Sequence, residues 1–176
     1  RIKNMKKILS FFALILLAVS AHAKLTVVAT TPDFGAIAQE IGGDKIELTT
    51  LAKATEDPHF VDAKPSFIVK LNRADVLIEG GAELEIGWLS PLLQGARNAK
   101  LEADKPGRIA CAEGISLLEI PTTLDRAKGD IHASGNPHYM ADPLNTKIVA
   151  KHIADSLCKL EPKSCDFFAA NLQQFN

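Results

Sequence analysis

Three histidines in this 176-residue chain lie in loops where they could bind a metal ion. His59 follows Pro58, His138 follows Pro137, and His132 stands six residues before His138. Neutral imidazole is the commonest protein ligand for zinc and its neighbours, and a preceding proline, whose φ is already fixed, reduces the entropy lost when the ring binds. From spacing alone, two alternatives stay open: a metal site that joins His59 and His138, or two unrelated loop histidines.

The sequence around these loops alternates between strand and helix patterns. Short apolar and β-branched runs predict four strands, at 25–29, 46–51, 75–78 and 108–111. Apolar residues at helical spacing predict helices at 34–41, from Pro65, from Leu84 to Leu93, at 144–160 and from Phe167. This alternation predicts an α/β fold with a parallel four-stranded sheet flanked by helices.

Both prolyl-histidine loops have a place in such a sheet. The loop 52–64 follows the second predicted strand, and in parallel sheets ligands bind beyond the carboxyl ends of the strands. Residues 121–143 read as a second, long polar loop, and loops of this length are usually functional or disordered. His152 falls inside the predicted helix 144–160, where we interpret it as a packing or surface residue.

The first 23 residues differ in kind from the rest of the chain. Lys6 and Lys7 precede an apolar run at 8–19, and Ala-His-Ala at 21–23 offers the small residues that signal peptidase accepts. A positive flank, a short apolar stretch and a small-residue exit are typical of a secretory signal. We therefore expect 1–23 to be a cleaved signal peptide with an upstream extension; a buried amino-terminal helix is the alternative.

Export sets the expected compartment and charge. Four of the 20 Lys and Arg residues precede the cut, which leaves 16 against 21 Asp and Glu residues, a formal charge of −5. A mildly acidic chain without a basic cluster argues against nucleic acid as a partner. Residue 24 is Lys and not Cys, so no lipid would be attached at the mature terminus. We expect a periplasmic monomer.

Three cysteines would then lie in an oxidising compartment. Cys158 and Cys165 stand seven residues apart around Pro162, where they could bridge a corner between two helices and leave Cys111 unpaired. A bridge depends on the separation of the two Cα atoms, which sequence spacing does not give. Both the bridged and the unbridged alternative stay open.

Two segments carry a resemblance to a known family. Asp57-Pro58-His59, followed by Pro65-Ser66, is similar to the first metal-binding loop of the zinc and manganese solute-binding proteins, the ZnuA-like or TroA-like family. The segment 129–143, GDIHASGNPHYMADP, resembles the second loop of that family. The agreement covers nearly the whole mature chain and extends to Val27 to Thr31, Ala74 to Ile78, Glu85 and Trp88.

The resemblance implies the substrate-binding component of an ABC importer. Such a protein captures a divalent transition metal, here zinc in preference to manganese, and delivers it to the permease in the inner membrane. The metal ligands fall on His59 and His138, while His132 matches a histidine that is not usually a ligand. Asp142 either supports a ligand or acts as a turn residue before Pro143. Zn²⁺ or Mn²⁺ is thus expected as the transported ligand.

The family completes its site with ligands from a second lobe, which this sequence does not reach. The resemblance therefore implies three parts: the signal at 1–23, the amino-terminal α/β lobe at 24–165, and the start of an interlobe linker helix at 166–176, where we expect the chain to be truncated. In this interpretation the fold is one lobe of a two-lobed, helix-linked metal-binding protein.

Two other classes of function compete with metal capture. An exported metal-dependent hydrolase would need a general base beside a metal-bound water, as in His-Glu-x-x-His, and the sequence has no such motif. A plain interaction domain would need neither His59 nor His138. Replacement of both histidines tests the interaction-domain alternative, because it abolishes metal binding only if the two are ligands. We expect no enzymatic activity.

Overall fold

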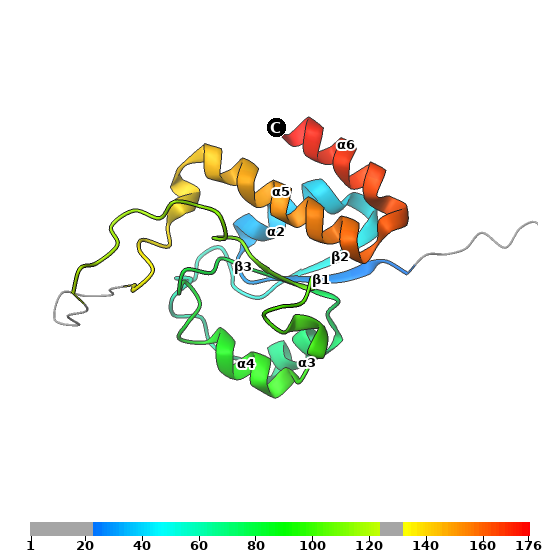
Figure 1. Ribbon diagram of the computed structural model, residues 1–176. Helices are drawn as coiled ribbons and strands as arrows, with labels where there is room; N and C mark the ends of the chain where they lie inside the picture. The colour runs from blue at the N-terminus through cyan, green and yellow to red at the C-terminus, as the bar shows by residue number, and fades with distance from the viewer. Residues whose placement is uncertain (1–22, 124–131) are drawn as a thin grey trace, which may run out of the picture.

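The computed structural model describes residues 23–123 and 132–176, which form a parallel sheet between two layers of helices (Figure 1). All pairings are parallel, and the strands lie in the order β2, β1, β3, β4. The strands are β1 (Leu25–Ala29), β2 (Ile46–Thr50), β3 (Val76–Glu79) and β4 (Arg108–Ala110). The predicted parallel four-stranded sheet flanked by helices is confirmed.

Helices cover both faces of the sheet (Figure 1). One face carries α2 (Pro32–Gly42), α5 (Pro143–Leu160) and α6 (Cys165–Phe175), and the other carries α3 (Pro65–Arg73) and α4 (Leu89–Ala96). Short 3-10 turns lie at Gly43–Lys45, Ala99–Leu101, Tyr139–Ala141 and Pro162–Ser164. No helix within the described ranges is long and apolar enough to cross a membrane.

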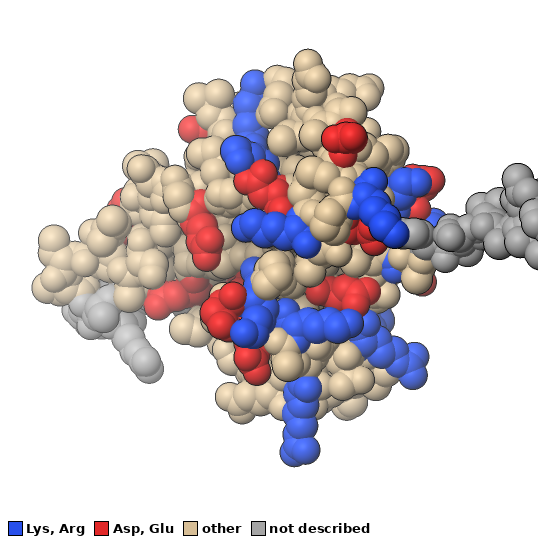
Figure 2. Space-filling model, turned by 45° about the vertical axis from the view of Figure 1, so that its right-hand side comes forward, with Lys and Arg blue, Asp and Glu red and all other residues tan. Residues whose placement is uncertain are grey.

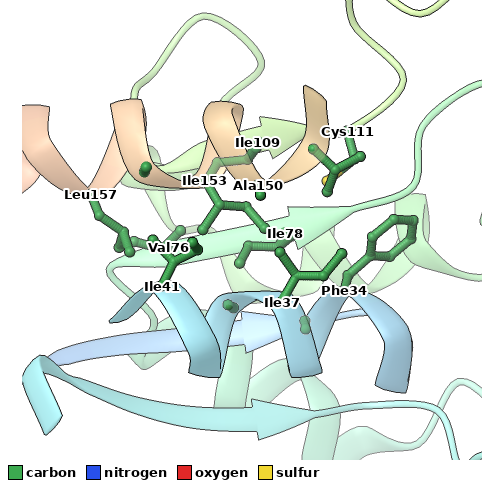
Figure 3. Close-up of a cluster of buried hydrophobic side chains, with 14 of the residues drawn as sticks. Phe34, Ile37, Ile41, Val76, Ile78, Ile109, Cys111, Ala150, Ile153 and Leu157 are labelled. Carbon is green, nitrogen blue, oxygen red and sulfur yellow. The ribbon is translucent and has the colours of Figure 1, made fainter. Parts of the chain in front are cut away.

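The alternation of side chains along the strands divides the core into two. Val76 and Ile78 of β3 pack toward α2 and α5, while Leu77 between them packs toward α3 and α4. Figure 3 shows Ile153 of α5 above β3, with Ile41 of α2 on the same face. Full burial of an aliphatic side chain stabilises a fold by about 1.5–3 kcal/mol. These contacts hold the carboxyl ends of β1 and β3 in a fixed position.

Proline defines the start of three helices. Pro32, Pro65 and Pro143 each lie in the first turn of α2, α3 and α5, where no backbone donor is needed. Asp142 also caps α5, since its side chain accepts a hydrogen bond from the backbone N–H of Leu144 at 2.8 Å. Asp142 therefore has the structural role that the sequence left as one of two alternatives.

The predicted helix from Leu84 to Leu93 is wrong in its first half. Helix α4 begins only at Leu89, and the residues before it form a series of turns. Gly81, Ala82 and Glu83, which directly precede the predicted helix, all have positive φ, so the chain enters residue 84 from a non-helical conformation. The apolar spacing correctly indicated that Leu84 is buried. It did not indicate a helix at that position.

Cys158 and Cys165 are bridged, with a Cα–Cα distance of 4.5 Å, and Cys111 is buried as a free thiol. The bridge joins the end of α5 to the first residue of α6. Helix α6 packs against the lobe: Phe168 is fully buried, and the Asn171 side chain donates to the carbonyl of Ile41 at 2.9 Å. The proposed boundary between residues 165 and 166 stays a prediction.

Charges of both signs lie side by side on the surface. On the face drawn in Figure 2, Lys and Arg side chains are interspersed with Asp and Glu. Exposed ion pairs include Lys100 with Asp75 and Lys151 with Asp155. Such pairs contribute little to stability, about 0–1 kcal/mol each. Residues 1–22, which hold almost all of the predicted signal peptide, and 124–131 lie outside the described residues.

Candidate metal centre

His59 and His138 meet at the carboxyl end of the sheet, although 79 residues separate them. Their Nε2 atoms lie 3.3 Å apart, and the rings stand edge to face with centroids 5.2 Å apart. Two nitrogens that bind one tetrahedral ion at the usual zinc–imidazole distance of about 2.0–2.1 Å are themselves about 3.3–3.4 Å apart. The pair is therefore spaced as two ligands of one ion would be.

A side-chain turn fixes the backbone of His59. The Asp57 carboxylate accepts the backbone N–H of His59 at 2.9 Å, across the intervening Pro58. Such Asx turns hold three residues in a compact bend, and the proline ring fixes φ at its centre. From the far side, the Trp88 indole N–H donates to the carbonyl of Pro58 at 2.8 Å. His59 is thus held by contacts on both sides of its proline.

His138 is held by a turn of the same kind. The side-chain oxygen of Asn136 accepts the backbone N–H of His138 at 2.9 Å, again across a proline. The amide nitrogen of Asn136 donates to Glu119 Oε2 at 2.8 Å, and its backbone N–H donates to the carbonyl of Leu118 at the same distance. These bonds tie the His138 turn to the chain that follows β4.

Tyr139 anchors the same turn to the sheet. Its hydroxyl donates to the carbonyl of Gly80 at 2.7 Å, and its own carbonyl accepts from the Asn145 side chain at 2.8 Å. Burial raises the pKa of the Tyr139 phenol well above its ordinary value, so the hydroxyl stays protonated and remains a donor. Sequence reasoning found the two histidines but assigned no role to Asn136 or Tyr139.

His132 lies against the pair. Its ring stacks on His59, with centroids 4.9 Å apart and an interplanar angle of 26°. Its Nδ1 is 3.9 Å from a carboxylate oxygen of Glu83, and the same oxygen accepts the backbone N–H of Ala133 at 2.6 Å. Across residues 23–123 and 132–176, no three His, Cys, Asp or Glu side chains are grouped as a metal site would require.

The three histidines open into one cavity. His59, His132 and His138 line it together with Glu119 and Asn136, and its volume is about 480 Å³. It opens broadly to the surface, and large apolar side chains near it are exposed: Phe60 and Leu118 expose 70% and 75% of their surfaces. An ion bound by the two histidines would still have its remaining coordination positions open on this side.

Glu85 is a buried carboxylate beneath the centre. Only 3% of its surface is exposed, and it accepts hydrogen bonds from the Thr30 hydroxyl at 2.6 Å and the backbone N–H of Gly80 at 2.7 Å. Desolvation raises the pKa of Glu85 to about 7, although these hydrogen bonds act in the opposite direction. The carboxylate connects the ends of β1 and β3 and does not line the cavity of the histidines.

A parallel sheet with a histidine pair at its carboxyl end has the form of one lobe of a periplasmic metal-binding protein, and solved structures of that class share the fold. A zinc-bound deletion mutant of ZnuA aligns with a TM-score of 0.72 at 27% identity, over 87% of this chain and 53% of the other. A manganese-bound periplasmic metal-binding protein from Candidatus Liberibacter asiaticus aligns with a TM-score of 0.70 at 23% identity, which shows the fold alone, over 86% and 52%.

The family described as "ZnuA: Zinc-uptake complex component A periplasmic" matches residues 27–176, and the chain belongs to it. Among its relatives, the metal ABC transporter substrate-binding lipoprotein FimA of Streptococcus parasanguinis is 31% identical over 97% of this chain and 57% of its own length. The manganese ABC transporter substrate-binding lipoprotein PsaA of Streptococcus mitis is 30% identical over 86% and 47%. The chain thus spans about half the length of these relatives, and the family resemblance seen in the sequence is confirmed.

Proposed function

We propose that this chain is the metal-capturing lobe of an exported substrate-binding protein, which binds one divalent transition metal and delivers it to an ABC permease. The observation that carries the proposal is the 3.3 Å separation of the Nε2 atoms of His59 and His138. An Asx-proline turn holds the backbone of each histidine. A preorganised pair loses little entropy on binding, which suits a protein that must capture a scarce ion.

Zinc is the metal that the ligand pair favours. Two imidazoles at tetrahedral spacing suit zinc, whereas carboxylate and water ligands suit manganese. The other ligands decide the final preference: a third imidazole favours zinc, and carboxylates shift the preference toward manganese. The relatives also differ in the metal that their names specify, which is manganese for PsaA and iron for MtsA of Streptococcus pyogenes.

The proposed partners and location follow from the family. Relatives are named as ABC transporter substrate-binding lipoproteins, which supports an exported protein that works with a membrane permease. We place this protein in the periplasm as a monomer, with residues 1–23 as its signal peptide. The same comparisons favour uptake over the exported metal-dependent hydrolase. The open side of the centre would face the second lobe, which would supply the remaining ligands.

Calorimetric titration of the full-length protein with Zn²⁺ and Mn²⁺ at fixed pH tests the proposal. We expect one-to-one binding, with tighter binding of Zn²⁺, and loss of at least about a hundredfold in affinity for His59→Ala and His138→Ala. His152→Ala is the matched control, because His152 lies on α5 and does not line the cavity. Wild-type affinity in the double variant His59→Ala/His138→Ala would refute the assignment of the site.

A further inference from the structure

Both histidine turns are hydrogen-bonded to one short segment, residues 80–88, which connects β3 to α4. At its end, the Trp88 indole N–H donates to the carbonyl of Pro58, the residue before His59. At its start, the carbonyl of Gly80 accepts the hydroxyl of Tyr139, the residue after His138. The two turns come from distant parts of the sequence, and both are hydrogen-bonded to this one segment.

These two hydrogen bonds lie in protected surroundings. Trp88 is 3% exposed and Tyr139 is 7% exposed, so neither donor can readily exchange its partner for water. A buried donor or acceptor that loses its partner carries a desolvation penalty, which makes the bonded geometry strongly preferred. Neither side chain lines the cavity of the histidines. Both act on the centre through the backbone next to a histidine.

The segment itself is held rigidly at its start. Glu85 accepts the N–H groups of Gly80 and Gly81 at 2.7 and 3.3 Å and the hydroxyl of Thr30 at 2.6 Å, which ties the segment to the end of β1. The carbonyl of Gly80 also accepts the backbone N–H of Ala112 at 2.9 Å. Gly80 is therefore fixed at both its N–H and its carbonyl.

The segment is closely packed near both of its ends. A Cβ on Gly80 would lie 3.1 Å from the ring of Phe34, and one on Gly87 would lie 3.3 Å from the carbonyl of His59. The glycine at 87 thus lets the segment approach the backbone of the histidine itself. Contacts at both ends place the histidine turns relative to one rigid element.

We infer that Trp88 and Tyr139 are positioning residues, which set the separation of the His59 and His138 imidazoles through the segment 80–88. The inference rests on the proposed function, in which these imidazoles bind the metal. Each residue fixes the backbone next to one ligand. Loss of either hydrogen bond therefore lets one imidazole change position relative to the other. The consequence is a less preorganised pair with a weaker and less regular coordination of the ion.

Conservative variants isolate the two bonds in the full-length protein. Tyr139→Phe removes only a hydroxyl, and Trp88→Phe keeps an aromatic ring but removes the N–H donor. We expect each to lower Zn²⁺ affinity by about three- to tenfold, the range set by the loss of one net hydrogen bond. With Co²⁺ as the spectroscopic probe, the visible d–d bands of both variants should shift or weaken, which reports distorted coordination.

A control variant separates positioning from general stability. Asn98→Ala removes hydrogen bonds of 2.8 Å to the carbonyls of Leu71 and Ala74, near the start of β3 at the other end of the sheet. It should lower the melting temperature without changing the Co²⁺ spectrum. In a His138→Ala background, Tyr139→Phe should no longer change metal affinity, since the ligand that it positions is gone.

The outcomes are distinct. Wild-type affinity and an unchanged Co²⁺ spectrum in Tyr139→Phe would overturn the inference even if Trp88→Phe failed to fold, because the hydroxyl is the smaller perturbation. An equal loss of affinity in Tyr139→Phe with and without His138 would also overturn it. Absence of Zn²⁺ and Co²⁺ binding by the wild-type protein would instead overturn the proposed function itself.

Discussion

Asp57 and Asn136 hold the two histidines in the same way. Each accepts, through its side-chain Oδ1, the backbone N–H of the histidine two residues later, and both distances are 2.9 Å. Each hydrogen bond spans a proline, so the same Asx-proline turn occurs twice at the metal centre. The charge of the acceptor is not shared, since one residue is a carboxylate and the other an amide.

The twin turns predict that geometry and not charge is what these residues contribute. Asp57→Asn keeps an acceptor at Oδ1. Asn136→Asp keeps one as well, but it must be combined with Glu119→Gln, because the Asn136 amide donates to Glu119 at 2.8 Å and a single Asp would put two carboxylates in contact. Asp57→Asn and Asn136→Asp/Glu119→Gln should both bind Zn²⁺ within about threefold of the wild type. Asp57→Ala and Asn136→Ala lose the acceptor and should bind about three- to tenfold more weakly, the loss of one hydrogen bond. Calorimetry on all four variants checks this. Weaker binding by Asp57→Asn than by Asp57→Ala would contradict it.

The elements of the fold that were predictable are those with a local cause. Leu25 to Ala29 is a short apolar, β-branched run bounded by turn residues, and β1 occupies those residues. The helix start at Pro65 was readable because proline suits a first turn. Trp88 was misassigned to a helix, because its burial depends on a tertiary contact with the His59 turn, and periodicity carries no information about that contact.

Imidazole chemistry and flanking prolines made the two histidines candidates in the sequence, and the family resemblance, not their spacing, paired them. The hydrogen bonds that hold the two histidine turns could not be predicted in this way. The bond from Tyr139 to Gly80 spans 59 residues, and that from Asn136 to Glu119 spans 17, so both exist only after the sheet has formed. The repeated Asx-Pro-His triplet was the one local signal of positioning, and it could have been read from the capacity of Asp and Asn to form such turns.

Burial of Glu85 predicts a specific pH dependence of stability. Desolvation raises the pKa of Glu85 to about 7 in the folded protein, from about 4.5 in the unfolded chain. The unfolded chain therefore binds fewer protons between these values. The contribution of this carboxyl to the free energy of unfolding is fully present below about pH 4.5 and falls as the pH rises to about 7, by up to about 3 kcal/mol.

Glu85→Gln isolates this effect, because glutamine does not titrate. In urea unfolding of the metal-free protein from pH 4.5 to 8, the wild type should lose stability relative to Glu85→Gln as the pH rises, with the change complete shortly above pH 7. Glu119→Gln is the matched control, since Glu119 lies at the rim of the cavity. A difference between wild type and Glu85→Gln that stays constant with pH would disprove the effect.

The bridge between Cys158 and Cys165 predicts sensitivity to reductant. It closes a short loop at the corner between α5 and α6, and a crosslink of this span stabilises a fold by about 2 kcal/mol in the chain-entropy account. Cys158→Ala/Cys165→Ala should unfold at lower urea concentration than the oxidised wild type, and dithiothreitol should bring the wild type to the same point. Cys111→Ala should keep its response to dithiothreitol; loss of that response would assign the effect to Cys111.

His132 gives the sharpest test of how many ligands this part of the chain supplies. It stacks on His59, and its Nδ1 lies near Glu83, an arrangement that supports the ring of a ligand from the side. His132→Ala should therefore weaken Zn²⁺ binding by about tenfold, the lower end of the range for groups that orient a ligand, against at least about a hundredfold for His59→Ala, because ligand support costs less than ligand loss. His132→Phe keeps a stacking ring without a nitrogen ligand, so it should restore most of the affinity. If His132→Phe bound as weakly as His59→Ala, the nitrogen itself would be required, and His132 would count as a third ligand.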